Sequence, residues 1–244
     1  MAESEKKPKT ITHADGTPAT VHAAKEVGNP TPYRIGAVIA WVIAIACEVL
    51  AILFVLNKIP LAKGNPLVVC IIFLVVDLAC VIAGSLCWKK ANHIDPASKK
   101  NKVKFWLWNN MGLIVCAFAF IPFIVIVLTN KEADKKTKTI AAVAAAVALA
   151  IGSLFSVDWN PISEEEKAEA IEEFGDTEVF WTKSGGVYHT STECGHLYNS
   201  TDLIVGSVEQ AIAEGKTRIC KSCEARDAAA AAEQGADEAG EPAA

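Results

Sequence analysis

Three cysteines and a histidine in the last third of the chain have the residue types and spacing of a metal site. They are His189, Cys194, Cys220 and Cys223, in the pattern His-x4-Cys-x25-Cys-x2-Cys. Structural zinc takes four nitrogen and sulfur ligands in a tetrahedron, and a Cys-x-x-Cys turn supplies two thiolates at once. The spacing therefore predicts one zinc ion held by these four side chains. His196 is an alternative fourth ligand because it lies two residues after Cys194.

The main alternative for the closing cysteine pair is redox chemistry. Cys220 and Cys223 could form a redox dithiol or a disulfide. Disulfides seldom persist in the cytoplasm, where this spacing more often binds metal. A thioredoxin-like motif would also need a βαβ context, which the neighbouring sequence lacks. A thiol-based sensor of redox or metal stress, which loses its zinc when this pair oxidises, remains a separate hypothesis.

Short segments within residues 179–226 must position the ligands. Val179–Thr182 and Val187–Thr190 are β-prone runs joined by Lys-Ser-Gly-Gly, which predicts a hairpin with His189 at the end of its second strand. We prefer this histidine as the fourth ligand for that reason. Ser207 begins a predicted helix, with a glutamine at the capping-box position. About fifty residues are too few to fold by apolar burial alone, so this small α+β module needs its metal.

The same stretch resembles a known zinc-binding fold. Tyr188-His189, the first cysteine at position 194, the helical sequence GSVEQAIAEGK and the closing Cys-x-x-Cys are similar to the Ada-type metal-binding module. Four apolar runs followed by DWNPIS and this module also resemble multipass membrane proteins of Gram-positive bacteria. The resemblance implies the same four ligands and no activity. The Ada-type module uses four cysteines and accepts a methyl group on one, whereas here the first ligand is a histidine.

Four long apolar runs before this module predict a transmembrane domain over residues 35–157. A helix needs about 20 apolar residues to cross a bilayer. The predicted spans are residues 35–56, 67–88, 105–128 and 139–157. The fold class is therefore mainly α, with a four-helix transmembrane bundle followed by a small α+β zinc-binding module. The lipid bilayer is the partner that these runs require.

The polar remainder of the chain divides into three predicted segments. Residues 1–34 carry almost no large apolar side chains and are predicted to be disordered, as is the acidic, alanine-rich tail 227–244. Residues 158–178 predict an acidic linker helix that starts with a Ser163–Glu166 capping box. Residues 158–244 hold 6 Lys and Arg against 19 Asp and Glu. A nucleic-acid partner is not expected from so acidic a tail.

Lysines in the short loops predict the orientation. Six lysines lie between the second and third predicted spans, whereas only Lys58 and Lys63 lie between the first and second. Cytoplasmic loops carry the excess of Lys and Arg. Four lysines between the third and fourth spans argue the other way, but tryptophans at positions 88, 106 and 108 flank the first Lys-rich loop as interfacial anchors. Both termini are expected in the cytoplasm, with the protein in the bacterial plasma (inner) membrane.

Two acidic residues interrupt the predicted spans. Glu48 is the one charge in the first span and Asp77 the one charge in the second. Such groups are costly in hydrocarbon and often mark an ion or proton path. Their depths would let them meet and share a proton or a cation. Alternatively, each is simply protonated, or faces a polar neighbour in the bundle.

Two further classes of function follow from these residues. The leading hypothesis is non-enzymatic: a membrane protein that holds a zinc module at the cytoplasmic face for partner interaction or sensing. Four protein ligands would leave zinc no open position for catalysis. Exposed aromatics such as Trp181 or Tyr198 would contact an unidentified protein partner. The alternative is a small ion or metal transporter that uses Glu48 and Asp77.

Overall fold

The chain forms two compact units, one of which is built from both ends of the sequence. The computed structural model describes residues 9–13, 16–59, 65–131 and 133–239. One unit contains Asn29–Pro161. The other combines the segment up to Gly28 with the segment that starts at Ile162. The predicted order, in which a membrane domain precedes a separate tail module, therefore misses the N-terminal contribution to the second unit.

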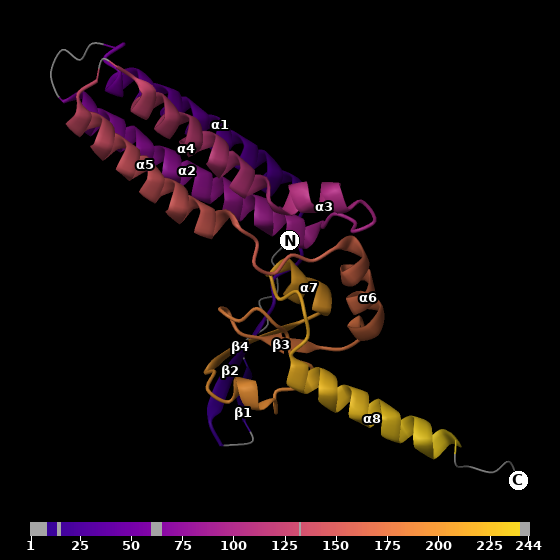
Figure 1. Ribbon diagram of the computed structural model, residues 1–244. Helices are drawn as coiled ribbons and strands as arrows, with labels where there is room; N and C mark the ends of the chain where they lie inside the picture. Colours follow the sequence, from indigo (N-terminus) through magenta and orange to yellow (C-terminus); the bar gives the residue numbers. More distant parts are fainter. Residues whose placement is uncertain (1–8, 14–15, 60–64, 132, 240–244) are drawn as a thin grey trace, which may run out of the picture. The chain divides into compact units, whose positions relative to one another are not determined.

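Four long helices run side by side in the first unit (Figure 1). Each of the four is long and apolar enough to cross a membrane. They are α1 (Thr31–Val55), α2 (Pro66–Ile94), α4 (Met111–Thr129) and α5 (Lys135–Ser156), with the short α3 (Lys102–Asn109) between α2 and α4. The prediction of four apolar helices is confirmed, and each is displaced from its predicted bounds by a few residues.

The third apolar run is divided into two helices, whereas the sequence predicts one span over 105–128. The run breaks at Asn110, between α3 and α4. The carbonyl of Trp108 accepts hydrogen bonds from the Trp88 indole at 2.8 Å and from the Asn92 side-chain amide at 3.0 Å. These side chains from α2 supply donors to a carbonyl near the break. The aromatic residues before Asn110 thus belong to a separate eight-residue helix.

The bundle has the polarity of a protein surrounded by lipid. Large apolar side chains point outward, including Val42, Phe118 and Leu154, which are 61%, 69% and 63% exposed. The face of α5 that points into the bundle carries small residues instead, and Ala141 and Ala145 on it are fully buried. Membrane helices associate through small residues that allow close approach, since lipid offers no hydrophobic drive between them. The arrangement suits a bilayer and would be unfavourable in water.

Glycines allow close contacts between the helices of the bundle, as two of them illustrate. A Cβ at Gly84 of α2 would lie 2.4 Å from the indole nitrogen of Trp41 in α1. A Cβ at Gly152 of α5 would lie 2.7 Å from the sulfur of Cys116 in α4. Both distances are shorter than any real contact, so these helices pack as they do because the side chain is absent. Each position lets a bulky or polarizable neighbour fill the groove.

Polar contacts join the helix ends from which both chain connections to the second unit depart. Arg34 at the start of α1 pairs with Asp95 after α2 at 2.9 Å. His93 of α2 lies 3.0 Å from Asp158, just after α5, in an ion-pair geometry. Lys89 donates to a carbonyl at the end of α5 at 2.6 Å. The Lys-rich connection between α2 and α3 therefore lies at this same end of the bundle.

The Asp158 carboxyl is held in its charged form at that end. Burial acts to raise its pKa, but the contact with His93, the backbone N–H of Asn160 and the charge of Lys89 outweigh burial, and the pKa lies below its ordinary value. A charged carboxylate therefore faces His93 and ties α5 to α2.

The described residues of the second unit form a four-stranded sheet with three α-helices and one 3₁₀ helix. Its elements are β1 (Lys9–Thr12), β2 (Pro18–Ala23), α6 (Glu164–Phe174), β3 (Val179–Trp181), a 3₁₀ helix (Gly195–Leu197), β4 (Asp202–Gly206), α7 (Val208–Ala213) and α8 (Lys221–Ala239). The strand order is β1-β2-β4-β3. β2 pairs in parallel with β4, and the other two pairs are antiparallel. Strands from the two ends of the chain thus form one sheet (Figure 1).

The N-terminal strands contradict the predicted disorder of residues 1–34. Ala19 and Val21 of β2 are buried, whereas Thr20 and His22 between them are not. This alternation is the period-two pattern of a strand with one covered face. Residues 1–8 and 14–15 of the predicted segment lie outside the described residues. Composition alone predicts disorder here because β2 buries few large side chains and pairs with β4, which is distant in the sequence.

His13 fastens the N-terminal hairpin to the C-terminal part of the sheet unit. Its ring is 4% exposed. Nδ1 lies 3.2 Å from the carbonyl oxygen of Thr192, and Nε2 lies 3.2 Å from that of Ser200. A neutral imidazole can donate to one of these carbonyls, and the protonated ring can donate to both. The ring also contacts Tyr198, at a centroid distance of 5.8 Å.

Three other segment predictions are modified by the structure. The predicted hairpin of residues 179–190 is reduced to a single bridge between Phe180 and His189, since β3 pairs mainly with β4. The predicted linker 158–178 contains α6 with its capping box, but α6 packs on α7 within the sheet unit. The tail predicted to be disordered from residue 227 continues α8 to Ala239, and residues 240–244 lie outside the described chain.

His13→Ala is expected to loosen the segment between Thr192 and Ser200. It removes the buried ring whose nitrogens lie 3.2 Å from the Thr192 and Ser200 carbonyl oxygens, and so leaves at least one of these carbonyls without its donor, at a cost of about 2 kcal/mol. Hydrogen–deuterium exchange of residues 191–200 in the full-length protein should rise. His22→Ala is the matched control because His22 lies on the next strand with a half-exposed side chain. Equal exchange in the two variants would contradict the role of His13.

Candidate metal centre

Four donor side chains from three separate segments meet at one point of the sheet unit. They are His189, Cys194, Cys220 and Cys223. One ligand atom from each lies within 4.8 Å of all the others, and all four side chains are buried. The distances rule out a disulfide among them in this structure, and all the cysteines of the chain are free. This group could hold a metal ion, and it is the group that the sequence spacing predicts.

The donor atoms lie close to the edge lengths of a coordination tetrahedron. The sulfurs of Cys194 and Cys220 are 4.0 Å apart, and the sulfur of Cys223 is 3.7 Å from Nδ1 of His189. Zinc with bonds of about 2.3 Å to sulfur and about 2.0 Å to nitrogen would set ligand atoms about 3.6–3.8 Å apart. Small inward movements of these side chains would therefore complete a tetrahedron. The ring nitrogen that faces the other donors is Nδ1.

Backbone hydrogen bonds bring the first and third ligand segments together. Tyr188 N–H donates to the carbonyl of Arg218 at 3.0 Å, and Cys220 N–H donates to the carbonyl of Tyr188 at 2.8 Å. Phe180 and His189 exchange a pair of hydrogen bonds at 2.7 Å. These bonds fix the metal-facing histidine between β3 and the segment that carries the cysteine pair. The ligand geometry is thus built by backbone pairing and not by the side chains alone.

Two short helical turns position the remaining cysteines. Cys194 precedes the 3₁₀ helix, and its carbonyl accepts from Leu197 N–H at 2.8 Å. Cys223 lies in the first turn of α8, where Glu224 N–H donates to the carbonyl of Cys220 at 2.9 Å. Leu197 and Leu203 are fully buried beside the cysteines. A small apolar cluster therefore packs against the three cysteines of the site.

His196 lies outside the donor group, although the sequence leaves it as an alternative ligand. Its Nε2 is 3.1 Å from the hydroxyl of Ser222, and its side chain is exposed. Ser222 stands between the two closing cysteines, so this contact lies beside the site. The structure groups His189, and not His196, with the three sulfurs.

Burial and nearby dipoles set the protonation of the donors. Burial, together with the charge of His196, lowers the pKa of His189 to about 4, so its ring is neutral near pH 7 and its nitrogen can bind a metal. Burial raises the pKa of Cys194 to about 11. Burial also acts to raise the pKa of Cys220, but the N–H groups of Ser222 and Cys223 outweigh it and lower that pKa. Cys220 is thus the thiol most readily ionised by its local backbone.

The cations near the cysteine pair play different parts. The sequence suggests that Lys216, Arg218, Lys221 and Arg226 favour the thiolates. Lys216 is buried and donates instead to the carbonyls of Lys183 and Gly185. Arg226 interacts electrostatically with Cys194 and Cys223, and the neighbouring Asp227 raises its pKa. Arg226 also donates to the Thr190 hydroxyl at 2.8 Å. It is therefore the cation that bridges the ligand segments.

The aromatic residues expected to face a partner differ in position. Trp181 is fully buried, and its indole donates to Glu214 at 3.0 Å, so it cannot contact a partner as predicted. Tyr198 is half-buried, and its hydroxyl donates to the carbonyl of Glu193 at 2.9 Å. The remaining aromatic candidate thus lies on the loop that follows Cys194.

The two acidic residues of the apolar helices are both inside the bundle. Glu48 is 5% exposed and Asp77 is fully buried. The charge of Glu48 acts on Asp77, as expected for side chains that approach each other from α1 and α2.

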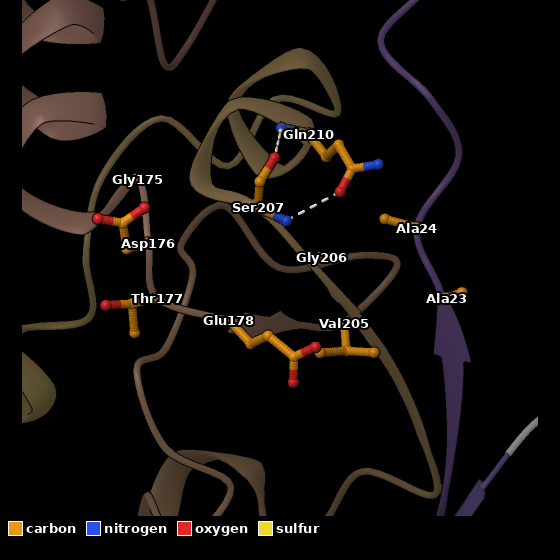
Figure 2. A pocket seen from close by; sticks show the side chains of 10 residues that line it. All are labelled: Ala23, Ala24, Gly175, Asp176, Thr177, Glu178, Val205, Gly206, Ser207 and Gln210. Carbon is orange, nitrogen blue, oxygen red and sulfur yellow. Dashed lines mark hydrogen bonds between the residues drawn. The ribbon is translucent and has the colours of Figure 1, made fainter.

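A hollow of about 390 Å³ lies elsewhere on the sheet unit and contains none of the four donors. Figure 2 shows Asp176 and Thr177 on one side of it and Ala23 and Ala24 on the other, with Ser207 and Gln210 between them. Ser207 N–H donates to Gln210 at 2.8 Å, and Gln210 N–H donates to the Ser207 hydroxyl at 3.2 Å. These capping bonds use the polar groups of Ser207 and Gln210, and none of the residues that line the hollow is one of the four donors. The hollow therefore adds nothing to the metal chemistry.

Comparisons of the chain with models of known protein families, with curated proteins and with solved structures find no match. The resemblance to the Ada-type module and to proteins of Gram-positive bacteria therefore rests on the quoted residues alone.

The sequence interpretation missed the N-terminal support of the site. His13 contacts the loop that carries Cys194, and β2 covers one edge of β4. The alternating pattern Pro-Ala-Thr-Val-His-Ala from Pro18 and the preceding Asp15-Gly16, a common turn dipeptide, are the signals that could have revealed a hairpin.

Substitution of the two histidines should distinguish their roles. His189→Ala is expected to reduce bound metal by close to one equivalent per chain, because three sulfurs without the imidazole leave the tetrahedron incomplete. His196→Ala is the matched control and should retain the metal. Elemental analysis of the purified full-length variants gives the answer. Metal loss in His196→Ala and not in His189→Ala would contradict the assignment.

Proposed function

We propose that the protein is a multipass membrane protein that holds one structural zinc ion in a module at the cytoplasmic face of a bacterial plasma membrane. The module serves partner interaction or sensing, and the protein is not an enzyme. The observation that carries the proposal is the convergence of one imidazole and three sulfurs within 4.8 Å.

The chemistry of the donors favours zinc over other metals. Three thiols and one imidazole are soft to borderline ligands, which suit zinc and not magnesium or calcium. Tetrahedral sites of this composition are the usual structural zinc sites. Four protein donors fill the tetrahedron and leave no position for a substrate or an activated water. A structural role for the ion follows from this complete set of protein ligands.

The sheet supports placing both chain ends on one side of the membrane. β2 precedes the first apolar helix and β4 follows the last, yet Val21 pairs with Leu203 in one register. Two strands of one sheet must lie in the same compartment, so the helices between them cross the membrane an even number of times. Four crossings satisfy this condition.

Charge and thiol chemistry support the cytoplasmic side. The Lys-rich connection from Lys89 to Lys104 lies at the end of the bundle from which both connections to the module leave. Positive loops are retained in the cytoplasm. Free cysteines as metal ligands also persist best in a reducing compartment.

The proposal predicts that zinc and the fold of the module are lost together. Cys220→Ser combined with Cys223→Ser should release one zinc per full-length chain and expose residues 179–226 to hydrogen exchange, while the apolar helices stay protected. Cys87→Ser, in α2, is the control that should change neither. A module that stays protected and metal-free in the double variant would show that its fold does not depend on zinc.

The membrane arrangement has its own test. Epitope tags at the two ends of the full-length protein should both resist protease in intact cells and both be cleaved in inverted membrane vesicles. A tag on a periplasmic domain of another membrane protein serves as the control for vesicle sidedness. One protected and one cleaved tag would be incompatible with the β2–β4 pairing, and two tags cleaved in intact cells would place the module outside.

A further inference from the structure

The short helix α3 presents an exposed apolar face at one end of the bundle. Val103, Trp106 and Leu107 form this apolar face and are 69%, 57% and 40% exposed. At about 100° per residue, side chains at positions i, i+3 and i+4 lie on one side of a helix. Lys102 and Lys104 are also exposed, and the same geometry places one on each edge of the apolar face. The helix is therefore amphipathic.

The opposite side of α3 is fixed to the bundle. The ring of Trp108 lies 5.1 Å from that of Trp88 in α2, and the guanidinium of Arg34 in α1 lies 5.6 Å from the centre of the Trp108 ring. Asn109 is buried, and its side-chain amide donates to the carbonyl of Phe105 at 3.0 Å. Because these contacts hold one side of α3 against α1 and α2, the apolar face points away from those helices.

The end of the bundle that carries α3 has the features of a membrane boundary. Ile35 near the start of α1 and Leu86 in α2 are 55% and 49% exposed, so the lipid-facing surface extends toward this end. Figure 1 shows α3 here, where α2 ends and α4 begins. Tryptophan is enriched where the acyl chains of a bilayer meet the headgroups. An exposed Trp106 beside lysines therefore suits that boundary.

The chain around α3 is strongly positive. Residues 89–110 contain six lysines and one acidic residue, Asp95. The carboxylate of Asp95 pairs with Arg34 at 2.9 Å. Four of the lysines come just before α3 or lie in its first turn, and all four are exposed: Lys99, Lys100, Lys102 and Lys104. Positive charge therefore adjoins the apolar face, and a partner of opposite charge is favoured.

An anionic phospholipid matches both features at once. Its acyl chains suit the apolar face, and its phosphate lies at the level that lysine side chains reach when they extend from the apolar layer toward water. A polynucleotide would match the lysines and leave the apolar face in water. Each basic residue near an anionic membrane surface strengthens the association by about fivefold. Several lysines on one short segment therefore give a clear preference for anionic over neutral lipid.

We propose that α3 lies in the membrane interface and, together with the lysines before it, binds the headgroups of anionic phospholipids. The apolar face enters the outer part of the acyl layer, and Lys100, Lys102 and Lys104 contact phosphate groups. The contacts of Trp108 with α1 and α2 join this lipid site to the bundle. The inference rests on the membrane placement in the proposed function and does not depend on the zinc module.

The first test counts the lipids that bind to the full-length protein in detergent micelles, by native mass spectrometry. Phosphatidylglycerol is the anionic probe, and phosphatidylcholine with the same acyl chains is the neutral one. The wild type should bind the anionic lipid at least about tenfold more tightly. Substitution of Lys100, Lys102 and Lys104 together by Gln should remove most of this preference.

A matched control removes the same charge from the opposite end of the bundle. Lys131, Lys135 and Lys136 lie at the connection between α4 and α5 and are exposed. Their joint substitution by Gln should leave the preference for phosphatidylglycerol as it is in the wild type. Equal losses in the two triple variants would show an effect of net charge alone and would overturn the assignment to α3.

Hydrogen–deuterium exchange of the wild type in nanodiscs locates the lipid contact without any variant. Residues 99–109 should exchange more slowly in phosphatidylglycerol than in phosphatidylcholine, while residues 133–138 exchange equally in both. Equal affinity for the two lipids, or equal exchange of α3 in the two nanodiscs, would overturn the proposal. A protein bound to α3 in place of lipid would give the second of these results. A chain that stays in solution without lipid or detergent would overturn the membrane placement as well.

Discussion

The convergence of four donor atoms on one point is the constraint on which the sheet unit depends. His189, Cys194 and the Cys220–Cys223 pair are separated along the chain, but their ligand atoms lie within 4.8 Å of one another. The apolar clusters around them are small, and short helices and a three-residue strand could not by themselves fix such a geometry. Backbone pairing between residues 188–189 and 218–220 brings the donors close, and an ion would lock them. Removing either contribution would leave three buried thiols with no common partner.

That unit extends to the other end of the chain, which constrains the whole architecture. The N-terminal hairpin adds two strands, and His13 fixes it to carbonyls on either side of the 3₁₀ helix. The metal-bearing loop is therefore clamped both by its own ligands and by residues that precede the first apolar helix. Because β4 follows the last apolar helix in the sequence, the sheet can be completed only after that helix has been made. β2 can therefore take its place in the sheet only once β4 is present.

The side chains of the bundle are arranged as suits surroundings of lipid and not of water. Large apolar side chains face outward, and alanine, glycine, serine and cysteine line the contacts between helices. In such an interior, a serine pair can be satisfied internally, as Ser85 and Ser156 are at 2.9 Å. A pair of carboxyls cannot be satisfied in that way. Oε1 of Glu48 and both carboxyl oxygens of Asp77 are buried without a hydrogen-bond partner among the described residues.

Local patterns in the sequence were sufficient for much of this structure. Four apolar runs predict four helices because the length and composition of a span are properties of consecutive residues. The capping boxes of Ser163 and Ser207 are formed as their spacing predicts, since the partners are three residues apart. The spacing of the donors predicts the metal group for a similar reason, because Cys-x-x-Cys is a local geometry. The sequence does not predict the break at Asn110, because the donors to the nearby Trp108 carbonyl are side chains of another helix.

Only the tertiary structure decided which distant segments pair. His13 and Ser200 are 187 residues apart in the sequence, and no local pattern predicts that they are in contact. The burial of Trp181 and the side of the 3₁₀ helix on which His196 falls were settled in the same way, by packing of strands that are remote in sequence. Consecutive residues predict the donor group, the four apolar helices and the capped helix starts, because these features depend on near neighbours in the chain. The sheet and the choice among histidines depend on contacts between segments that lie far apart along the chain, and only the folded chain defines those.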